Sequence, residues 1–169
     1  MQTSHDQPAR YYKVFYNHGP MEPLTEAEAK SSDIYISKDD RSVPRYKRFI
    51  DGKLHSIVYP GVSDPASVIA DLIAGHEGVP AIAFSSPERT ATGGYKWREW
   101  HMSVDGSIEA TVEQEFGGDD RQLRLSRYTN GGVLAGFTDY IYDHENTLTE
   151  LVHRDGQGTV KMREDVDPF

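Results

Sequence analysis

The strongest constraint on the fold is a strict alternation of apolar and polar residues in the segment 107–116, Ser-Ile-Glu-Ala-Thr-Val-Glu-Gln-Glu-Phe. Its apolar side chains Ile108, Ala110, Val112 and Phe116 all stand at even-numbered positions. A period of two is typical of a β-strand with one buried face and one solvent-facing face. We therefore expect these four side chains to share the buried face of a sheet.

The segment 95–163 around this strand is an alternation of strand-like runs and turn sequences. The pairs Asp105-Gly106, Asn130-Gly131 and Asp155-Gly156 follow one another at steps of 25 residues. Such pairs favour tight hairpin turns because both residue types tolerate positive φ, and the equal steps indicate repeated hairpin units. The strands expected here are 95–104, 107–116, 123–128, 133–142, 147–153 and 159–163. This spacing predicts an antiparallel meander that forms a strongly curved sheet or a partly open barrel.

Two stretches of this meander carry a family resemblance over 127–160. Tyr140-Ile-Tyr-Asp143, followed by Leu148 and Asp155-Gly156, resembles the YD-repeat hairpins of Rhs-type proteins, and Arg127–Leu134 resembles a degraded second copy. In that family a Tyr-Asp pair precedes a small-residue turn and a strand with leucine. The chain departs from the pattern after Asp143, where the family has a glycine in the turn. The resemblance implies β-hairpins and an association with bacterial toxin systems.

The sequence upstream of residue 95 predicts shorter strands and two helices. Asp64 and Pro65 are typical of a helix start, and an apolar stripe continues from them over 64–75. Thr25 and Glu28 have the spacing of a capping box for a short helix over 24–30. Asp51-Gly52 predicts a type I′ turn within a hairpin over 45–59. The further strands expected are 10–16, 33–37 and 79–84.

These elements together predict the α+β class. We expect a curved antiparallel sheet covered by one main helix over 64–75 and by a short N-terminal helix. The 169-residue length suits a single domain, which we place at 10–169 after a flexible tail over 1–9.

The amino-acid composition limits the classes of binding partner and of chemistry that we expect. The chain has 27 acidic against 18 basic residues and a net charge of −9, which argues against nucleic acid and anionic membranes and is compatible with a basic protein. It has no cysteine, so disulfides, thiolate nucleophiles and Cys-ligated metals are excluded. The N-terminus lacks the apolar run of a secretory signal, so we expect a cytoplasmic protein.

The acidic residues around 105–120 are the first candidate site. Glu109, Glu113 and Glu115 are expected on the solvent face of one strand, and Asp119 and Asp120 in the following turn. Neighbouring carboxylates repel one another, so this face would attract a basic protein partner. The structural alternative is a solvated face that protects the sheet from edge-to-edge association. Arg45, Lys47, Arg48 and Lys53 form a smaller basic group, which we interpret as a solvated face.

A pocket is the second candidate. His101 follows Trp97 and Glu99 in one strand, and with Tyr140 it would give an aromatic pocket with a general base. The alternative is a packed, hydrogen-bonded histidine. His144 and His153 have no recognised ligand spacing, so we expect no metal. No catalytic motif is found, and no cofactor is expected.

The leading hypothesis is therefore a cytoplasmic, non-enzymatic immunity or inhibitor protein. It would neutralise a basic bacterial or phage protein through the acidic face. The alternative is a small-molecule carrier with a barrel-like sheet, or a cofactor-free enzyme, with a pocket around His101. Stabilisation by a small ligand would favour the alternative, because binding to the folded state alone raises its stability.

Overall fold

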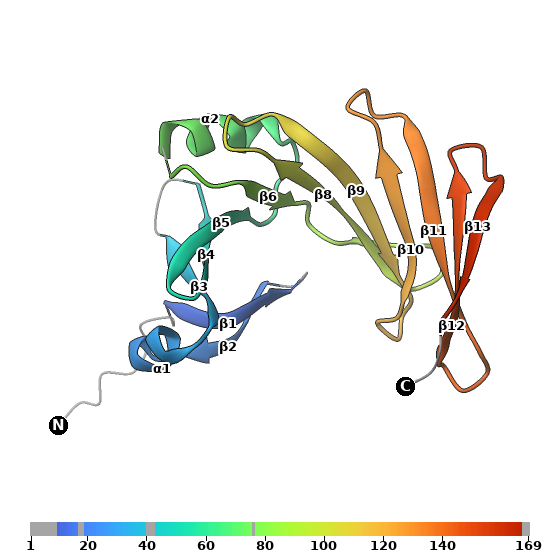
Figure 1. Ribbon diagram of the computed structural model, residues 1–169, viewed down its shortest axis with the longest axis horizontal. Coiled ribbons are helices and arrows are strands. Elements are labelled where there is room, and N and C mark those ends of the chain that lie inside the picture. Colours follow the sequence, from blue (N-terminus) through green and yellow to red (C-terminus); the bar gives the residue numbers. More distant parts are fainter. Residues whose placement is uncertain (1–9, 17–18, 40–42, 76, 167–169) are drawn as a thin grey trace.

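A computed structural model describes residues 10–16, 19–39, 43–75 and 77–166, so the expected tail over 1–9 lies outside the described residues. The described strands form one open, curved sheet that bends into an arch (Figure 1). Its order is β13-β12-β11-β10-β9-β8-β6-β5-β4-β3-β1-β2, and β7 pairs with β8 beside this path. The predicted α+β class with a curved antiparallel sheet is confirmed. Because β2 and β13 form separate edges, the sheet is open.

The element bounds are close to those expected. The strands are β1 (Tyr11–Tyr16), β2 (Gly19–Leu24), β3 (Ile34–Asp39), β4 (Arg45–Ile50), β5 (Lys53–Tyr59), β6 (Ala81–Phe84), β7 (Glu88–Arg89), β8 (Tyr95–Met102), β9 (Ile108–Phe116), β10 (Gln122–Tyr128), β11 (Leu134–Tyr142), β12 (Leu148–Asp155) and β13 (Val160–Asp165). The helices are α1 (Glu26–Ser31) and α2 (Ala66–Gly75). Neither described helix is long and apolar enough to cross a membrane.

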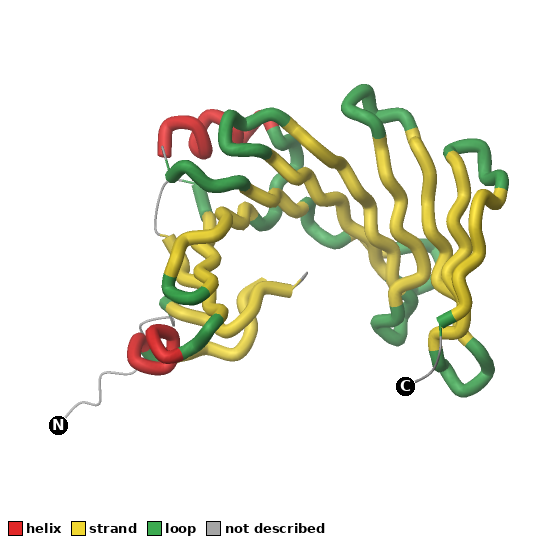
Figure 2. Tube along the Cα trace, viewed as in Figure 1, coloured by secondary structure: helices red, strands yellow, loops and turns green. Residues whose placement is uncertain are grey.

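Helix α2 is the main cover of the sheet. Asp64 caps it by accepting a hydrogen bond from the backbone N–H of Ala66 at 3.0 Å, as predicted. Its buried side chains Val68 and Leu72 pack on strand residues in one core cluster. The full cluster is Ile57, Tyr59, Val62, Val68, Leu72, Ala81, Ala83, Trp100 and Met102. Figure 2 shows α2 on the outer side of the arch, so we call the side under α2 the outer face and the opposite side the inner face.

Two features of the N-terminal half differ from an all-antiparallel meander. Strands β5 and β6 are parallel, because α2 carries the chain back across the sheet in a crossover connection. Strand β2 occupies a segment for which the sequence predicted no strand, and its last residue, Leu24, was expected to begin the first helix. Its prolines Pro20 and Pro23 are compatible with an edge strand, where one side of the backbone needs no ladder partner.

The local turn and cap predictions in this half are confirmed. Thr25 and Glu28 form both halves of the capping box of α1. Asp51 and Gly52 have φ values of 48° and 71°, as a type I′ turn requires.

The C-terminal meander is built from five hairpin turns of one geometry. Each turn spans five residues. The backbone N–H of the first residue donates to the carbonyl of the fifth residue, and the N–H of the fourth residue donates to the carbonyl of the first. The fourth residue always has positive φ, which defines a type I turn with a G1 bulge. The turns are 103–107, 117–121, 129–133, 143–147 and 155–159. Their positive-φ residues are Gly106, Asp120, Gly132, Asn146 and Gly158.

These turns correct the predicted repeat. Turns at the same end of the meander begin at residues 103, 129 and 155, a step of 26 residues. Asp105-Gly106 occupies the third and fourth positions of its turn, Asn130-Gly131 the second and third, and Asp155-Gly156 the first and second. The three pairs that suggested a step of 25 residues are therefore not equivalent. In the turn after Asp143, where the YD-repeat pattern has glycine, Asn146 takes the left-handed conformation. Asparagine is among the residues that tolerate this conformation best.

The prediction that Ile108 shares a face with Ala110, Val112 and Phe116 is wrong. A register shift pairs Met102 with Ile108 but His101 with Ala110. Because neighbouring strand residues point to opposite faces, Ile108 joins Met102 under α2, while Ala110 lies on the inner face with His101. The turn before the bulge fits closely against α2, since a Cβ added at Gly106 would lie 2.8 Å from Ile69 Cγ2.

Candidate functional site

The inner face of β3 to β6 carries a pocket with a volume of about 680 Å³. Its walls are mainly apolar side chains from alternate strand positions, and residues of β1 and of the α1–β3 connection form its rim. The lining residues are Lys13, Ser31, Ser32, Asp33, Ile34, Ile36, Arg48, Ser56, Val58, Ile82 and Phe84.

Strand β5 contributes side chains to both faces of the sheet, because successive residues of a strand point to opposite faces. Ser56 and Val58 point to the pocket, whereas Ile57 and Tyr59 point to α2, and all four are buried. Val58 is paired with Ile82 on the neighbouring strand, so both lie on the inner face. A strand buried on both sides reads as a continuous apolar run, and the run Ile-Val-Tyr of 57–59 has this pattern.

Arg48 is the positively charged residue on the strand wall of the pocket. It lies between Ile36 on β3 and Ser56 on β5, which are 2 % and 4 % exposed. In the part of the chain that the structure describes, its side chain forms no ion pair and no hydrogen bond. The other two charged lining residues are exposed at the rim. Lys13 pairs with Glu22 at 3.0 Å, and Asp33 is the single acidic group of the lining.

Arg45 on the outer face of the same strand has the opposite environment. It is completely buried, and its guanidinium contacts Asp39 at 2.7 Å, Glu77 at 2.9 Å and Asp71 at 3.1 Å. The Tyr59 hydroxyl donates to Asp71 at 2.7 Å, and burial raises the pKa of Tyr59 to about 12. Burial opposes the charge of Arg45, but the hydrogen bonds with Tyr59 and Asp39 hold its pKa above the ordinary value.

This cluster is a structural tie rather than a binding site. It joins β4 to α2 and to the segment after it, because its carboxylates come from β3, α2 and Glu77. The predicted solvated basic face is therefore wrong at Arg45, which the chain neutralises internally.

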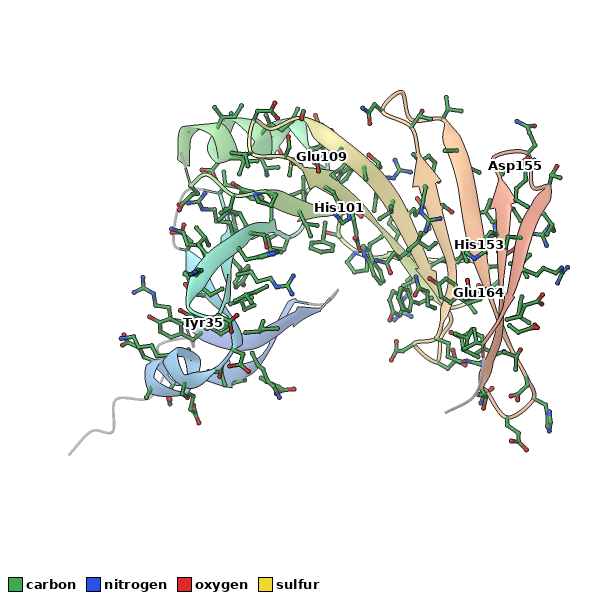
Figure 3. All side chains as sticks on the ribbon, in the orientation of Figure 1. Tyr35, His101, Glu109, His153, Asp155 and Glu164 are labelled. Carbon is green, nitrogen blue, oxygen red and sulfur yellow. The ribbon has the colours of Figure 1, made fainter. Side chains whose placement is uncertain are left out.

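His101 lies on the inner face next to the pocket. Its Nε2 is 3.2 Å from the Glu99 carboxylate, which also accepts hydrogen bonds from Trp97 Nε1 at 2.9 Å and from the Gln114 amide. The proton of neutral His101 is assigned to Nε2 from this network, which leaves Nδ1 as an acceptor. His101 is paired with the pocket residue Ile82, and Figure 3 shows it in the middle of the arch.

The three residues of the predicted aromatic pocket have different roles. His101 is partly exposed, whereas Trp97 is 2 % exposed and stacks on Phe116 with ring centroids 4.6 Å apart. Tyr140 is on β11, three strands from β8, or roughly 14 Å at the usual strand spacing. The structure brings Trp97 and His101 together through Glu99, and it places Tyr140 outside this group.

The acidic residues of β9 and its turn do not form one uniform patch. Glu113 pairs with Arg98 at 3.1 Å and with Lys96 at 3.6 Å. Asp119 pairs with Arg121, whose hydrogen bond lowers the Asp119 pKa, and Asp120 accepts from Tyr95 at 2.8 Å. Glu109 and Glu115 form no ion pair within the described residues. Figure 3 places Glu109 at the α2 end of β9, whereas Asp119 and Asp120 follow its opposite end.

The two other candidate histidines lie apart in the meander. His144 is exposed in the turn 143–147. His153 contacts Thr138 through Nδ1 at 3.0 Å, and its buried Nε2 is 3.5 Å from a Glu164 oxygen (Figure 3). Among the described residues no group of three metal-ligating side chains is arranged to hold an ion.

Sequence reasoning missed the pocket itself. Its residues come from five strands, the end of α1 and the α1–β3 connection, so no local motif marks them. One signal was present in β4. Arg45 and Lys47 stand at odd-numbered positions and Arg48 at an even-numbered one, so the Arg48 side chain had to point to the other face of the sheet. Comparison of the chain with protein-family models, with curated proteins and with solved structures gives no significant match. The geometry is therefore the basis for a functional proposal.

Proposed function

We propose that this protein binds a small, largely apolar molecule in the inner-face pocket. The observation that carries the proposal is the pocket of about 680 Å³ lined by Ile34, Ile36, Val58, Ile82 and Phe84. Ligand sites in proteins typically have volumes of roughly 300–1,000 Å³, apolar walls and a few polar groups. Ile34 is 45 % exposed, so a ligand would also cover apolar surface that now faces water.

A neutral fluorescent probe tests this proposal. N-phenyl-1-naphthylamine should bind the wild-type protein with increased fluorescence and should raise its unfolding temperature, because it binds the folded state alone. The variant Ile82→Trp fills the pocket and should lose most of the binding. Ile141→Trp is the matched control, since Ile141 is 41 % exposed on β11, away from the lining residues. Equal binding by both variants would place the probe elsewhere and contradict the proposal.

A basic protein partner, bacterial or phage, is the second proposal, as for an immunity or inhibitor protein of the cytoplasm. The observation that favours it is that Glu109 and Glu115 on β9 carry no ion pair among the described residues. Uncompensated carboxylates speed the encounter with a cationic surface. A pull-down from host lysate should recover a basic protein at low salt and lose it at high salt. The double variant Glu109→Lys with Glu115→Lys should lose it at low salt, and unchanged recovery would reject this surface.

A further inference from the structure

We infer that the ligand of the inner-face pocket is a monocarboxylate with an extended apolar chain, whose carboxylate binds Arg48. This inference rests on the proposed function and names the ligand class of the same site. It follows from the environment of Arg48, from the contrast with Arg45 and from the path of the apolar wall.

The environment of Arg48 favours an anionic group on the ligand. Its neighbours across the two strand pairings, Ile36 and Ser56, are both buried, so the base of its side chain is in a dry part of the sheet. A charge that is partly removed from water is costly unless a counterion or hydrogen bonds compensate it. The described part of the chain supplies none. A guanidinium binds a carboxylate through two parallel hydrogen bonds, which makes this anion the natural complement.

Arg45 and Arg48 of strand β4 differ in their partners. Arg45 is surrounded by three carboxylates of the chain itself, within 3.1 Å of its guanidinium. The fold therefore places acidic side chains where an arginine serves the structure. Arg48, three residues further along β4, lines a pocket instead and keeps its donors for a group from outside.

The apolar wall of the pocket extends away from Arg48 across two neighbouring strands. From Arg48 on β4 the wall continues through Val58 on β5 to Ile82 and Phe84 on β6. Arg48 is level with Ser56, and Ile82 is level with Val58, so Ile82 lies two strand spacings and two residues away, or roughly 12 Å. Phe84 stands two residues further along β6, at roughly 16 Å. This path suits an extended chain of medium length rather than a compact polar molecule.

The far end of this apolar wall lies next to a carboxylate of the chain. Phe84 is paired with Glu99 on β8, whose carboxylate is already held by Trp97, Gln114 and His101. A second negative charge on the ligand would approach this carboxylate and be repelled. The site therefore favours one anionic end at Arg48 and a neutral opposite end.

A pair of ligands that differ only in their end group tests the inference. Decanoate and 1-decanol are each titrated against the protein with bound N-phenyl-1-naphthylamine at pH 7. A charge-assisted pair contributes roughly 1.5–3 kcal/mol, so decanoate should bind about tenfold or more tightly than decanol. Arg48→Met should remove this preference, because it should weaken the binding of decanoate far more than the binding of decanol. Arg48→Lys should retain part of it, because a lysine keeps the charge but not the planar pair of donors.

The control is Arg89→Met, which removes an exposed arginine from β7, outside the lining residues, and should leave the preference intact. Unfolding temperatures of all variants without ligand verify that each is folded. Equal affinity of wild type for decanoate and decanol, with the probe bound, would overturn the carboxylate inference and leave the pocket proposal standing. Failure of the probe to bind would overturn both.

Discussion

The two halves of the sheet are built on different principles. In the half from β1 to β6, the described connections differ in kind, α2 covers the outer face of β5 and β6, and the inner face is hollowed into a pocket. In the half from β8 to β13, one turn geometry is repeated, and neither described helix covers β10 to β13 (Figure 1). Repetition produces an extended scaffold, whereas the irregular half brings side chains from several strands to one place.

Strands β10 to β13 of the repetitive half are held together by cross-strand pairs instead of a helix-covered core. On its outer face Asp139 joins Arg124 at 2.7 Å and Arg154 at 3.0 Å, across three adjacent strands. The guanidinium of Arg124 also lies 4.3 Å from the centre of the Phe137 ring. The apolar stems of long side chains cover their neighbours, and Val152 in this layer is only 2 % exposed.

The largest expected effect that separates the two halves comes from Arg45. Arg45→Met removes the cation between three largely buried carboxylates and should destabilise the protein by about 3–5 kcal/mol. Arg124→Met in the meander breaks more exposed pairs and should cost about 1 kcal/mol or less. Chemical denaturation monitored by fluorescence compares the two variants. Equal losses would show that the buried cluster is not the stronger tie.

A second prediction uses pH. Burial raises the pKa of Tyr59 to about 12 in the folded protein, above the ordinary value of 10.0. Protonated Tyr59 therefore contributes stability that is fully present below pH 10 and is lost as the pH rises toward 12. Denaturation between pH 9 and 12 should show a steeper loss for wild type than for Tyr59→Phe. If the two curves run parallel, ionisation of Tyr59 does not limit alkaline stability.

The third prediction compares two turns of the repeat. Gly106→Ala and Gly132→Ala both place a side chain at positive φ, which costs about 1 kcal/mol. A Cβ at Gly106 would also meet Ile69 at 2.8 Å, whereas at Gly132 it meets nothing within 4 Å. Thermal unfolding should therefore show the larger loss for Gly106→Ala. A larger loss for Gly132→Ala would contradict the close packing of the first turn against α2.

The smallest effect is expected at Asn146, which has a φ of 67° where glycine is more tolerant. Asn146→Gly should change stability by less than about 1 kcal/mol, since relief of backbone strain offsets the greater freedom of the unfolded chain. The same thermal unfolding experiment measures it. A loss comparable with that of Gly106→Ala would mean that the asparagine side chain is needed in the turn.

The two halves also differ in how much of their structure could be predicted from the sequence. Strand alternation and turn residues are local, so the meander, the capping box at Thr25 and the Asp51-Gly52 turn could be read directly. The side on which Ile108 lies depends on a bulge opposite Met102, and this register is a property of two strands together. The pocket depends on pairings among distant segments, so Arg48 could be noticed as a charge but not recognised as a site residue.

The most direct test of the account is to map ligand contacts across both halves at once. Backbone amide resonances of labelled protein are followed by NMR during titration with decanoate. We expect shifts concentrated in β3 to β6, including Ile36, Arg48, Val58 and Ile82, with β10 to β13 unchanged. Shifts confined to the meander, or no saturable shifts in β3 to β6, would contradict the assignment of the irregular half as the binding half.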